Sequence, residues 1–388
     1  NVSRQQGSRN ANVTGSKFEI RDKSNTYAIK GFGAISNVYI KTDNNGTGAS
    51  SLGYKYNAEF GKISGNFQFE LEQNVESDTY DPNDLGFLYN NNEISNVIRF
   101  RYNIYKPFWK LLKLYSFIGT DYNTLYKPRN FTEYGIFGMV NTTTLKYLSG
   151  GVSFRAIPVE SYDYFESRVD GRYFIRPKKF NVNGWISTDY RKKMALDINF
   201  YIKKANKYDH KVFRIGINPR IRINDKLSFV YRFKVNNDYN NIGFATIDTS
   251  ANIIFGKRNI QTINNTISGN YIFTNKIALG LRVRHYWSQA KYDQFYFLQD
   301  DGYLGYTDYS ADHNINFNAF NIDVVYTWEF APGSEMKIVW KNAILRTQNE
   351  LIDNFYRNLE NTWDSPQANS VSIKLLYYLD YLYFKKTT

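Results

Sequence analysis

The chain has 388 residues, of which 42% are hydrophobic and 18% aromatic, with a formal net charge of +13 and no cysteine. The absence of cysteine excludes disulfides, thiolate metal sites and cysteine nucleophiles, and no stretch approaches the roughly 20 apolar residues that a transmembrane helix requires. The mean hydropathy of −0.53 is typical of a soluble protein, but half of each strand of a transmembrane barrel faces water. This composition therefore leaves a membrane barrel open.

The N-terminal stretch is polar. Residues 1–25 are predicted to form a polar N-terminal periplasmic segment, with a short strand over 16–22. Residues 1–15 lack the apolar core of a signal peptide, so the chain is expected to be a mature or trimmed product. No Pro- or Ser-rich linker divides the rest, and 26–388 are predicted to form one outer-membrane barrel domain.

Strand-like stretches then alternate with two kinds of connection. Tight connections, rich in Pro, Gly, Asn and Asp as hairpin turns are, lie at 61–65, 106–109, 190–193, 224–226, 274–276 and 331–335. Long connections lie at 41–50, 77–92, 158–179, 238–258, 289–315 and 347–368. Outer-membrane barrels have short periplasmic turns and long extracellular loops, so the tight turns are predicted to be periplasmic.

The predicted fold is an all-β, antiparallel transmembrane β-barrel of about 16 strands, in a range of about 14 to 18. The alternation of strand direction is least secure around 131–180, where 168–177 could be a further strand. The predicted strands are 26–40, 51–61, 65–76, 93–105, 110–126, 131–141, 145–157, 180–190, 193–203, 210–223, 226–237, 259–273, 275–288, 316–330, 334–347 and 369–384.

The last predicted strand shows the two-residue period most clearly. Its odd face is apolar from Val371 to Tyr383, and its even face carries Lys374 and Asp380. Strands of a soluble sandwich usually run about 5–6 residues, and this stretch is much longer. It is typical of a barrel strand that is apolar outside and polar inside, with the last strand of a soluble sandwich as the alternative.

Charged residues of the other strands share one face, which is assigned to the lumen because an Arg at mid-depth on a lipid face costs about 2–4 kcal/mol. Strand 110–126 cannot be oriented in this way. The predicted basic lumen residues are Arg99, Arg101, Arg214, Arg220, Arg222, Arg232, Lys234, Arg282 and Arg284. The predicted acidic lumen residues are Asp197, Asp323, Glu329 and Asp380. The predicted lipid-facing residues are Ile277, Leu279, Leu281, Val283, Val371, Ile373 and Leu375.

Histidines offer no catalytic or metal arrangement. An outer-membrane lipase uses a His and a nearby Ser on the outside of the barrel, on one face. His285 and Ser288 are three residues apart and so point to opposite faces of a strand. We therefore expect His285 to belong to the aromatic girdle at the membrane interface, with no catalytic residue and no enzyme.

Carboxylates gather in the long connections. The stretch 81–86 begins like a calcium loop, but Leu85 stands at its fifth position and no Glu at its twelfth. Asp78, Asp81 and Asp84 are therefore only a weak calcium candidate beside a solvated rim that faces lipid phosphates through divalent ions. No metal or other cofactor is predicted, and no nucleic-acid partner, because the Arg and Lys residues interleave with apolar residues on strands.

Residues 76–88, 284–288, 330–335 and the final strand resemble an outer-membrane β-barrel domain family of unknown function from Gram-negative bacteria. In that family the barrel usually follows a domain similar to a family-nine carbohydrate-binding module, which this sequence lacks. The resemblance covers nearly the whole chain. It implies a barrel and an outer-membrane location, with no enzyme and no known substrate.

Two functions remain open. The first is an outer-membrane channel or solute-uptake barrel with a basic lumen, which would prefer anions because the inward cations outnumber the anions. The second is a non-catalytic scaffold or accessory subunit of a larger outer-membrane complex, in which the same charges form salt bridges across a plugged lumen. The expected partners are outer-membrane lipid and lipopolysaccharide, and for the scaffold other outer-membrane or periplasmic proteins.

Overall fold

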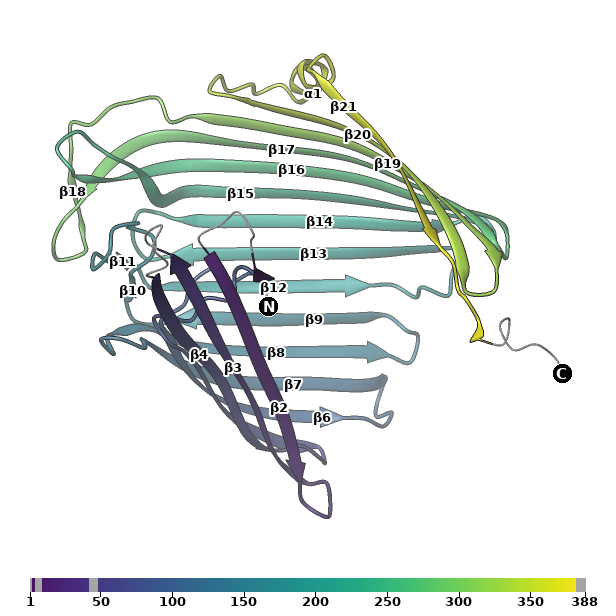
Figure 1. Ribbon diagram of the computed structural model, residues 1–388, viewed down its shortest axis with the longest axis horizontal. Coiled ribbons are helices and arrows are strands. Elements are labelled where there is room, and N and C mark those ends of the chain that lie inside the picture. The colour runs from purple at the N-terminus through teal and green to yellow at the C-terminus, as the bar shows by residue number, and fades with distance from the viewer. Residues whose placement is uncertain (1, 4–8, 42–47, 382–388) are drawn as a thin grey trace.

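The computed structural model describes residues 2–3, 9–41 and 48–381. All but two of the described strands belong to one sheet of 19 strands, in which each long strand pairs antiparallel with the next along the chain. The sheet is strongly curved (Figure 1). The predicted all-β, antiparallel fold is confirmed. No helix in the described part of the chain is long and apolar enough to span a membrane.

The first half of the meander consists of β2 (Arg9–Arg21), β3 (Tyr27–Lys41), β4 (Gly48–Lys62), β5 (Phe67–Glu76), β6 (Glu93–Ile104), β7 (Leu111–Leu125), β8 (Phe131–Thr144) and β9 (Ser149–Ile157). The second half consists of β12 (Lys179–Ser187), β13 (Met194–Ala205), β14 (Lys211–Arg222), β15 (Leu227–Ile247), β16 (Ile253–Thr274), β17 (Ile277–Leu298), β19 (Ile315–Ala331), β20 (Ser334–Gln348) and β21 (Gln367–Leu376). The short elements are β1 (Val2–Ser3), β10 (Ser161–Asp163), β11 (Phe174–Arg176), β18 (Leu304–Tyr306) and the helix α1 (Phe355–Trp363).

The two outer long strands, β2 and β21, do not pair with each other among the described residues. Figure 1 shows a gap between them, and every residue of β21 is exposed. Both strands run from the end of the sheet that carries the long connections to the end that carries the tight turns. The described sheet is therefore a curved wall with two open edges.

The pairing register separates a polar face from an apolar face, because residues directly opposite one another on neighbouring strands share a face. Arg99 lies opposite Glu70 and Arg282 lies opposite Asp323, whereas Leu281 lies opposite Val324. The strand that sequence could not orient, β7, is placed by the pairing of Gly119 with Arg99. Alternating polar and apolar residues thus give the sheet two chemically distinct sides.

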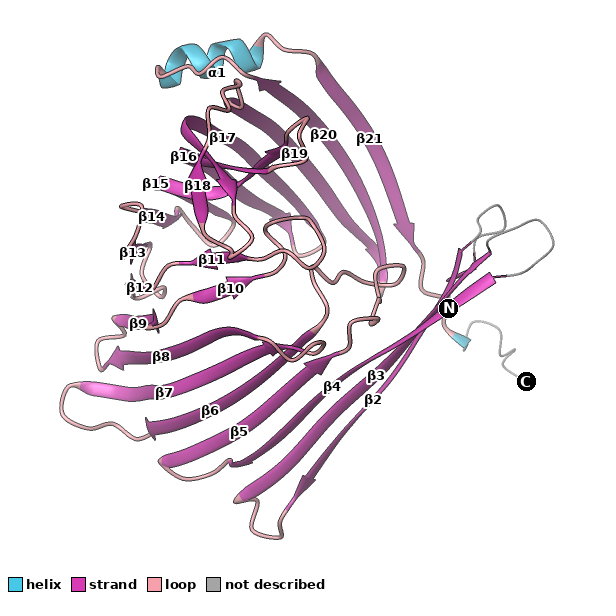
Figure 2. Cartoon of the chain, turned by 90° about the vertical axis from the view of Figure 1, so that its left-hand side faces the viewer, coloured by secondary structure: helices cyan, strands magenta, loops and turns pink. Residues whose placement is uncertain are grey.

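The polar face is the concave one. The hairpin of β10 and β11 lies inside the curve of the sheet in Figure 2, and it forms one cavity together with Glu133 and Lys179 of the polar face. Helix α1 lies outside the curve, against the apolar face (Figure 2).

The connections fall into the two predicted kinds. At one end lie the tight turns, such as 275–276 and 332–333, where Gly333 has a φ of 72° that a residue with a side chain rarely adopts. At the other end lie the connections 77–92, 158–178, 299–314 and 349–366. Two loops are shorter than predicted, because β15 and β16 continue pairing far into 238–258 and β17 continues to Leu298.

Both ends of the sheet differ from the prediction. Arg9–Arg21, expected within a separate polar segment, pairs along its whole length with β3. Its alternation is hidden in the sequence because Asn10, Asn12, Thr14 and Ser16 place polar residues on the side that later carries Phe18 and Ile20.

At the other end, β21 stops at Leu376, eight residues before the predicted end of the strand at 384. The backbone N–H of Tyr378 donates to Ser334 Oγ at 2.9 Å instead of continuing the ladder. Asp380 therefore follows the strand, and its predicted inward position is wrong. Residues 382–384 lie outside the described residues.

The separation of long loops from tight turns predicts the orientation in the membrane. The chain has no native cysteine, so single cysteines at Asp353, in a long loop, and Asp225, in a tight turn, can be labelled without background. Asp301 is expected on the same side as Asp353. We expect a membrane-impermeant maleimide to label position 353 in intact cells and position 225 only after lysis. Labelling of 225 but not 353 in intact cells would invert the orientation.

Candidate functional site: the concave face and its inward hairpin

On β3 to β12, cations of the concave face are paired with carboxylates. Lys30 Nζ lies 2.7 Å from Glu59 Oε1, and Arg101 Nη2 lies 2.7 Å from Glu70 Oε2. Further ion pairs join Arg99 to Glu70, Lys55 to Glu76, Arg155 to Asp121 and Glu133, and Lys179 to Glu133. The charge of this half of the face is therefore largely neutralised by contacts between neighbouring strands.

The other half, on β13 to β17, is different. Arg220 and Arg282 are paired with Asp197 and Asp323 at 3.4 Å and 2.5 Å. Six other cations of the concave face on β13, β14, β15 and β17 form no ion pair within the described residues. We call these six the basic stripe, and they are Lys203, Arg214, Arg222, Arg232, Lys234 and Arg284.

Uncharged residues surround the basic stripe. Arg214 donates to Asn236 Oδ1 at 3.1 Å, and its guanidinium lies 5.0 Å from the centre of the Tyr201 ring. Arg232 and Arg284 both lie opposite Thr266 of β16. Because these neighbours of Arg214, Arg232 and Arg284 carry no negative charge, the positive charge of the three side chains remains available to a solute in the concavity, whereas Lys203 lies near the carboxylate of Asp238. Lys203 was not among the sequence candidates, although it is two residues from Tyr201 and six from Asp197, an even spacing that places it on their face.

The register places the other sequence candidates as follows. Arg99, Arg101, Asp197, Asp323 and Glu329 share the concave face with the basic stripe. The candidates for lipid contact lie on the opposite face of β17 and β21, and these are Ile277, Leu279, Leu281, Val283, Val371, Ile373 and Leu375.

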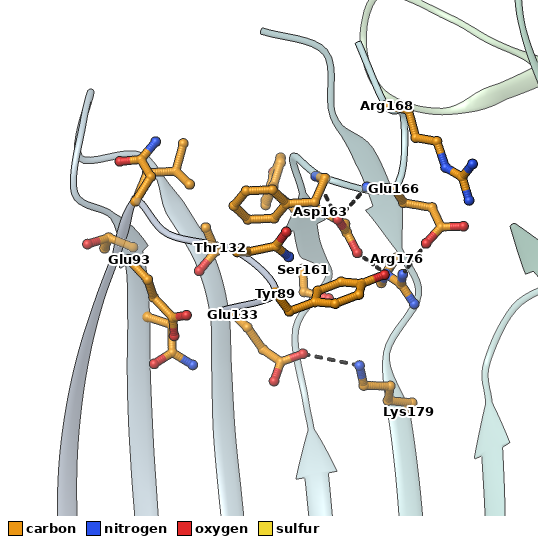
Figure 3. A pocket seen from close by; sticks show the side chains of 17 residues that line it. Tyr89, Glu93, Thr132, Glu133, Ser161, Asp163, Glu166, Arg168, Arg176 and Lys179 are labelled. Atoms are coloured by element: carbon orange, nitrogen blue, oxygen red, sulfur yellow. Dashed lines mark hydrogen bonds and ion pairs between the residues drawn. The ribbon is translucent and has the colours of Figure 1, made fainter. Parts of the chain in front are cut away.

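A polar cavity of about 630 Å³ lies on the concave face beside the hairpin of β10 and β11 (Figure 3). The sheet contributes Glu133 and Lys179, which are 3.1 Å apart, and the segment 161–176 contributes Asp163 and Arg176. Arg176 Nε donates to Asp163 Oδ2 at 2.6 Å and Nη2 donates to Glu166 at 3.2 Å. The cavity is thus walled by charges of both signs that hold one another in place.

An apolar cluster fixes the hairpin inside the curve. The rings of Phe174 on β11 and Phe255 on β16 are 4.8 Å apart and almost fully buried, together with Ile242, Ile253 and Leu298. Glu166 Oε1 accepts a hydrogen bond of 2.9 Å from the backbone N–H of Phe244. This cluster also explains why β15 and β16 are longer than predicted, since their ends bury apolar side chains against the hairpin. The hairpin is therefore a built part of the concave face.

Two long connections and the short connection 206–210 meet at the rim through Glu160. Its carboxylate lies 2.7 Å from Lys207 Nζ and accepts a hydrogen bond of 2.8 Å from the Tyr303 hydroxyl. The hydrogen bond from Lys207, followed by that from Tyr303, lowers the pKa of Glu160 below its ordinary value. The contact joins 158–178 to 206–210 and 299–314.

This lowered pKa predicts a pH dependence of the rim. A carboxyl whose folded pKa is depressed stabilises the folded contact above its unfolded pKa of about 4.3, and this contribution is lost as the pH falls through the folded pKa. We expect the protection of 158–178 and 299–314 from hydrogen exchange, relative to an unstructured peptide at the same pH, to fall between pH 6 and pH 3, while the ladder of β13 and β14 stays protected. In Glu160→Gln the rim should be weakly protected at both pH values. An unchanged profile in that variant would contradict this role.

The weak calcium candidates do not converge. Arg9 Nη2 lies 2.6 Å from Asp81, Arg9 Nε lies 2.8 Å from Asp84, and Asp78 lies 3.9 Å from Lys127. No group of three or more potential metal ligands lies together among the described residues. Arg9 is on β2, so the ion pairs tie the connection 77–92 to the first long strand.

His285 is not in an interfacial girdle, contrary to expectation. It is 4% exposed, and its ring centre lies 5.4 Å from that of Phe355 on α1. Ser288 lies on the opposite face, opposite Thr262 of β16. The sequence of 347–368 was interpreted as a plain loop, so the helix that covers His285 was missed.

The chain is therefore an all-β protein built on an antiparallel meander with one charged concave face and one apolar convex face. The chain belongs to the family described as "Domain of unknown function (DUF5916)", whose model matches residues 1–388. This agrees with the resemblance to a family of unknown function. The association with a carbohydrate-binding-like domain remains an expectation.

Curated proteins include no match to the chain. Among solved structures, the ferric enterobactin receptor (PfeA) in complex with BCV-L6 is similar with 7% identity and a TM-score of 0.49, covering 96% of this chain and 71% of the receptor. An anion-selective porin from Comamonas acidovorans has 10% identity and a TM-score of 0.34, covering 87% and 90%. The outer-membrane channel DcaP of Acinetobacter baumannii has 10% identity and a TM-score of 0.35, covering 96% and 97%.

Proposed function

We propose that the protein is an outer-membrane β-barrel that conducts small anionic solutes. The observation that carries this proposal is the basic stripe, whose six cations lie on one side of the concavity with no ion-pair partner within the described residues. Unpaired Arg and Lys side chains raise the local concentration of anions and repel cations, most strongly in a narrow, low-dielectric passage.

The convex face supports a membrane location. Large apolar side chains are exposed there along many strands, including Ile198, Ile217, Ile267 and Val371. In water such a surface is costly, whereas lipid accommodates it. Outer-membrane lipid and lipopolysaccharide are therefore the proposed surroundings.

The edges of the described sheet must be paired if the sheet lies in a membrane. Backbone groups within lipid must be hydrogen-bonded inside the protein, so an open sheet edge is not stable there. Because β2 and β21 run in the same direction, an antiparallel barrel with an even number of strands requires an odd number of further strands between them. We propose that β1 (Val2–Ser3), which pairs antiparallel with Ala11 and Asn10 of β2, belongs to this closure.

The inward hairpin supports a constriction. It is fixed by Phe174 and Phe255 inside the curve and presents Asp163 and Arg176 to the cavity. A solute passing along the concave face would meet these charges at close range, where electrostatic selection is strongest. The proposed path therefore lies between the hairpin and the basic stripe.

Solute uptake into proteoliposomes tests this function. We expect vesicles that contain the purified protein to admit a small organic anion several-fold faster than a cation of similar size, and protein-free vesicles to admit neither. Equal uptake of both ions would contradict the proposed anion selectivity. The absence of uptake would contradict the proposed channel function.

A scaffold of a larger outer-membrane complex is the second candidate. It is favoured by the ion-paired half of the concave face and by the fixed hairpin, which together resemble a stiffened, plugged interior more than a passage. Its partners would be other outer-membrane or periplasmic proteins. For both candidates we propose a non-enzymatic role, because His285 and Ser288 lie on opposite faces.

A further inference from the structure

We propose that the groove between helix α1 and the convex face is a binding site for an acyl chain of a membrane lipid. The proposal rests on the membrane location given under the proposed function, and it is independent of conduction. It concerns the convex face of β14 to β19, on the opposite side of the sheet from the basic stripe.

A polar clamp holds α1 on this otherwise apolar face. Asn358 of the helix exchanges hydrogen bonds with Asn318 at 2.6 and 3.1 Å and accepts another from Asn316 at 3.1 Å. Trp287 Nε1 donates to Asn316 at 2.8 Å. All four side chains are at most 2% exposed. Because buried amides are costly unless they are hydrogen-bonded, this network fixes the helix in one place.

The fixed helix forms one wall of a groove. A cavity of about 530 Å³ extends from Pro219 and Ile221 of β14 to Phe355 and Leu359 of α1. Its floor crosses β15, β16, β17 and β19, with Phe229, Ile267 and Val283 among the lining residues. No charged side chain lines it, and apart from Asn265 and His285 the lining is aliphatic or aromatic.

An acyl chain is the ligand that this chemistry selects. An apolar cavity does not hold ordered water, which needs two to four polar partners, and an empty cavity loses the dispersion contacts of its walls. The groove crosses five neighbouring strands, so at the usual spacing of about 4.8 Å it extends about 19 Å. One leaflet of the hydrocarbon core is about 15 Å thick, which is comparable with this length.

The outer surface of α1 fits the level of the lipid headgroups. Tyr356 is 79% exposed, and Trp363 is 51% exposed although its ring packs edge-to-face on Phe320 of β19 at 5.3 Å. Such amphipathic rings favour the membrane interface. Arg357, exposed between them in the sequence, can reach a lipid phosphate. A lipid anchored at this level would place its chain beneath the helix.

Photolabelling tests the site. The protein is reconstituted in phosphatidylcholine vesicles that contain a phosphatidylglycerol with a diazirine midway along one acyl chain, and the adducts are mapped by mass spectrometry. We expect adducts on 265–267 and 355–359 several-fold above those on the rest of the convex face. Ile267→Trp, which fills the groove, should remove this excess. Ile217→Trp, on the same face but outside the groove, should keep it.

Each other outcome overturns a definite part of the proposal. Adducts spread evenly over the convex face, unchanged in Ile267→Trp, would mean ordinary lipid contact and no site. An absence of adducts from the whole convex face would remove the membrane location and the proposed function with it. If Ile267→Trp fails to fold, judged by heat-modifiable mobility in gels, competition by excess unlabelled phosphatidylglycerol replaces it. In that experiment a binding site predicts that the unlabelled lipid removes the excess of adducts on 265–267 and 355–359.

Discussion

Replacing Arg214, Arg232 and Lys234 together by Glu is expected to convert an anion-preferring channel into a cation-preferring one. The three residues lie on the adjacent strands β14 and β15, on one face, with no carboxylate paired to them within the described residues. Each substitution exchanges a cation for an anion where no partner compensates the change, so the local potential changes sign. The permeability ratio of chloride to potassium across a planar bilayer measures the effect.

The matched control reverses charges in the exposed turn 105–110, between β6 and β7. Lys106→Glu with Lys110→Glu changes the sequence charge in the same direction but on the other half of the sheet from the basic stripe, where ions of the solution screen it over about 10 Å at 0.1 M salt. The permeability ratio should therefore hardly change in the control. A triple variant that keeps the wild-type preference would show that the basic stripe does not line the path.

Leu279→Arg is expected to impair assembly more than Arg282→Leu. Leu279 lies opposite Tyr271 and Tyr326 on the convex face, two residues after β17 begins at Ile277, where a charge on the lipid face costs about 1 kcal/mol, less than at mid-depth. Because about 1.4 kcal/mol corresponds to a factor of ten in an equilibrium, the ratio of folded to unfolded protein should fall severalfold. Heat-modifiable mobility in gels after reconstitution measures this ratio.

Arg282→Leu removes one ion pair with Asp323 on the concave face. Lys341 lies opposite Asp323 on β20, so this carboxylate keeps a cation nearby. The loss should therefore be small. A larger assembly defect in Arg282→Leu than in Leu279→Arg would mean that the two faces have been exchanged.

Sequence alone could predict the faces wherever the two-residue period is chemically marked. In β17 the alternation of Leu279, Leu281 and Val283 with Arg282 and Arg284 settles the orientation, and the register agrees with it. The period carries no such mark in β2, where the side that carries Phe18 and Ile20 begins with the polar residues Asn10 and Asn12, so the alternation reverses along the strand. The same reasoning placed Asp380 inward only because the strand was assumed to continue past Leu376.

The candidate site was less predictable because it depends on contacts between distant segments. The position of the hairpin follows from the packing of Phe174 on Phe255, which are 81 positions apart (255 minus 174) and have no local signal. Helix α1 did have a signal, since Asn354 caps its N-terminus by accepting a hydrogen bond from the Arg357 N–H. Spacing of Phe355, Leu359 and Thr362 on one side would have predicted a helix.

The reversal potential of the purified wild-type protein in a planar bilayer, under a gradient of potassium chloride, tests the central claim most directly. A basic stripe that lines a conducting path predicts a potential displaced toward the equilibrium potential of chloride. A displacement toward the equilibrium potential of potassium would contradict the account, and the absence of any conductance would leave the scaffold as the function of this fold.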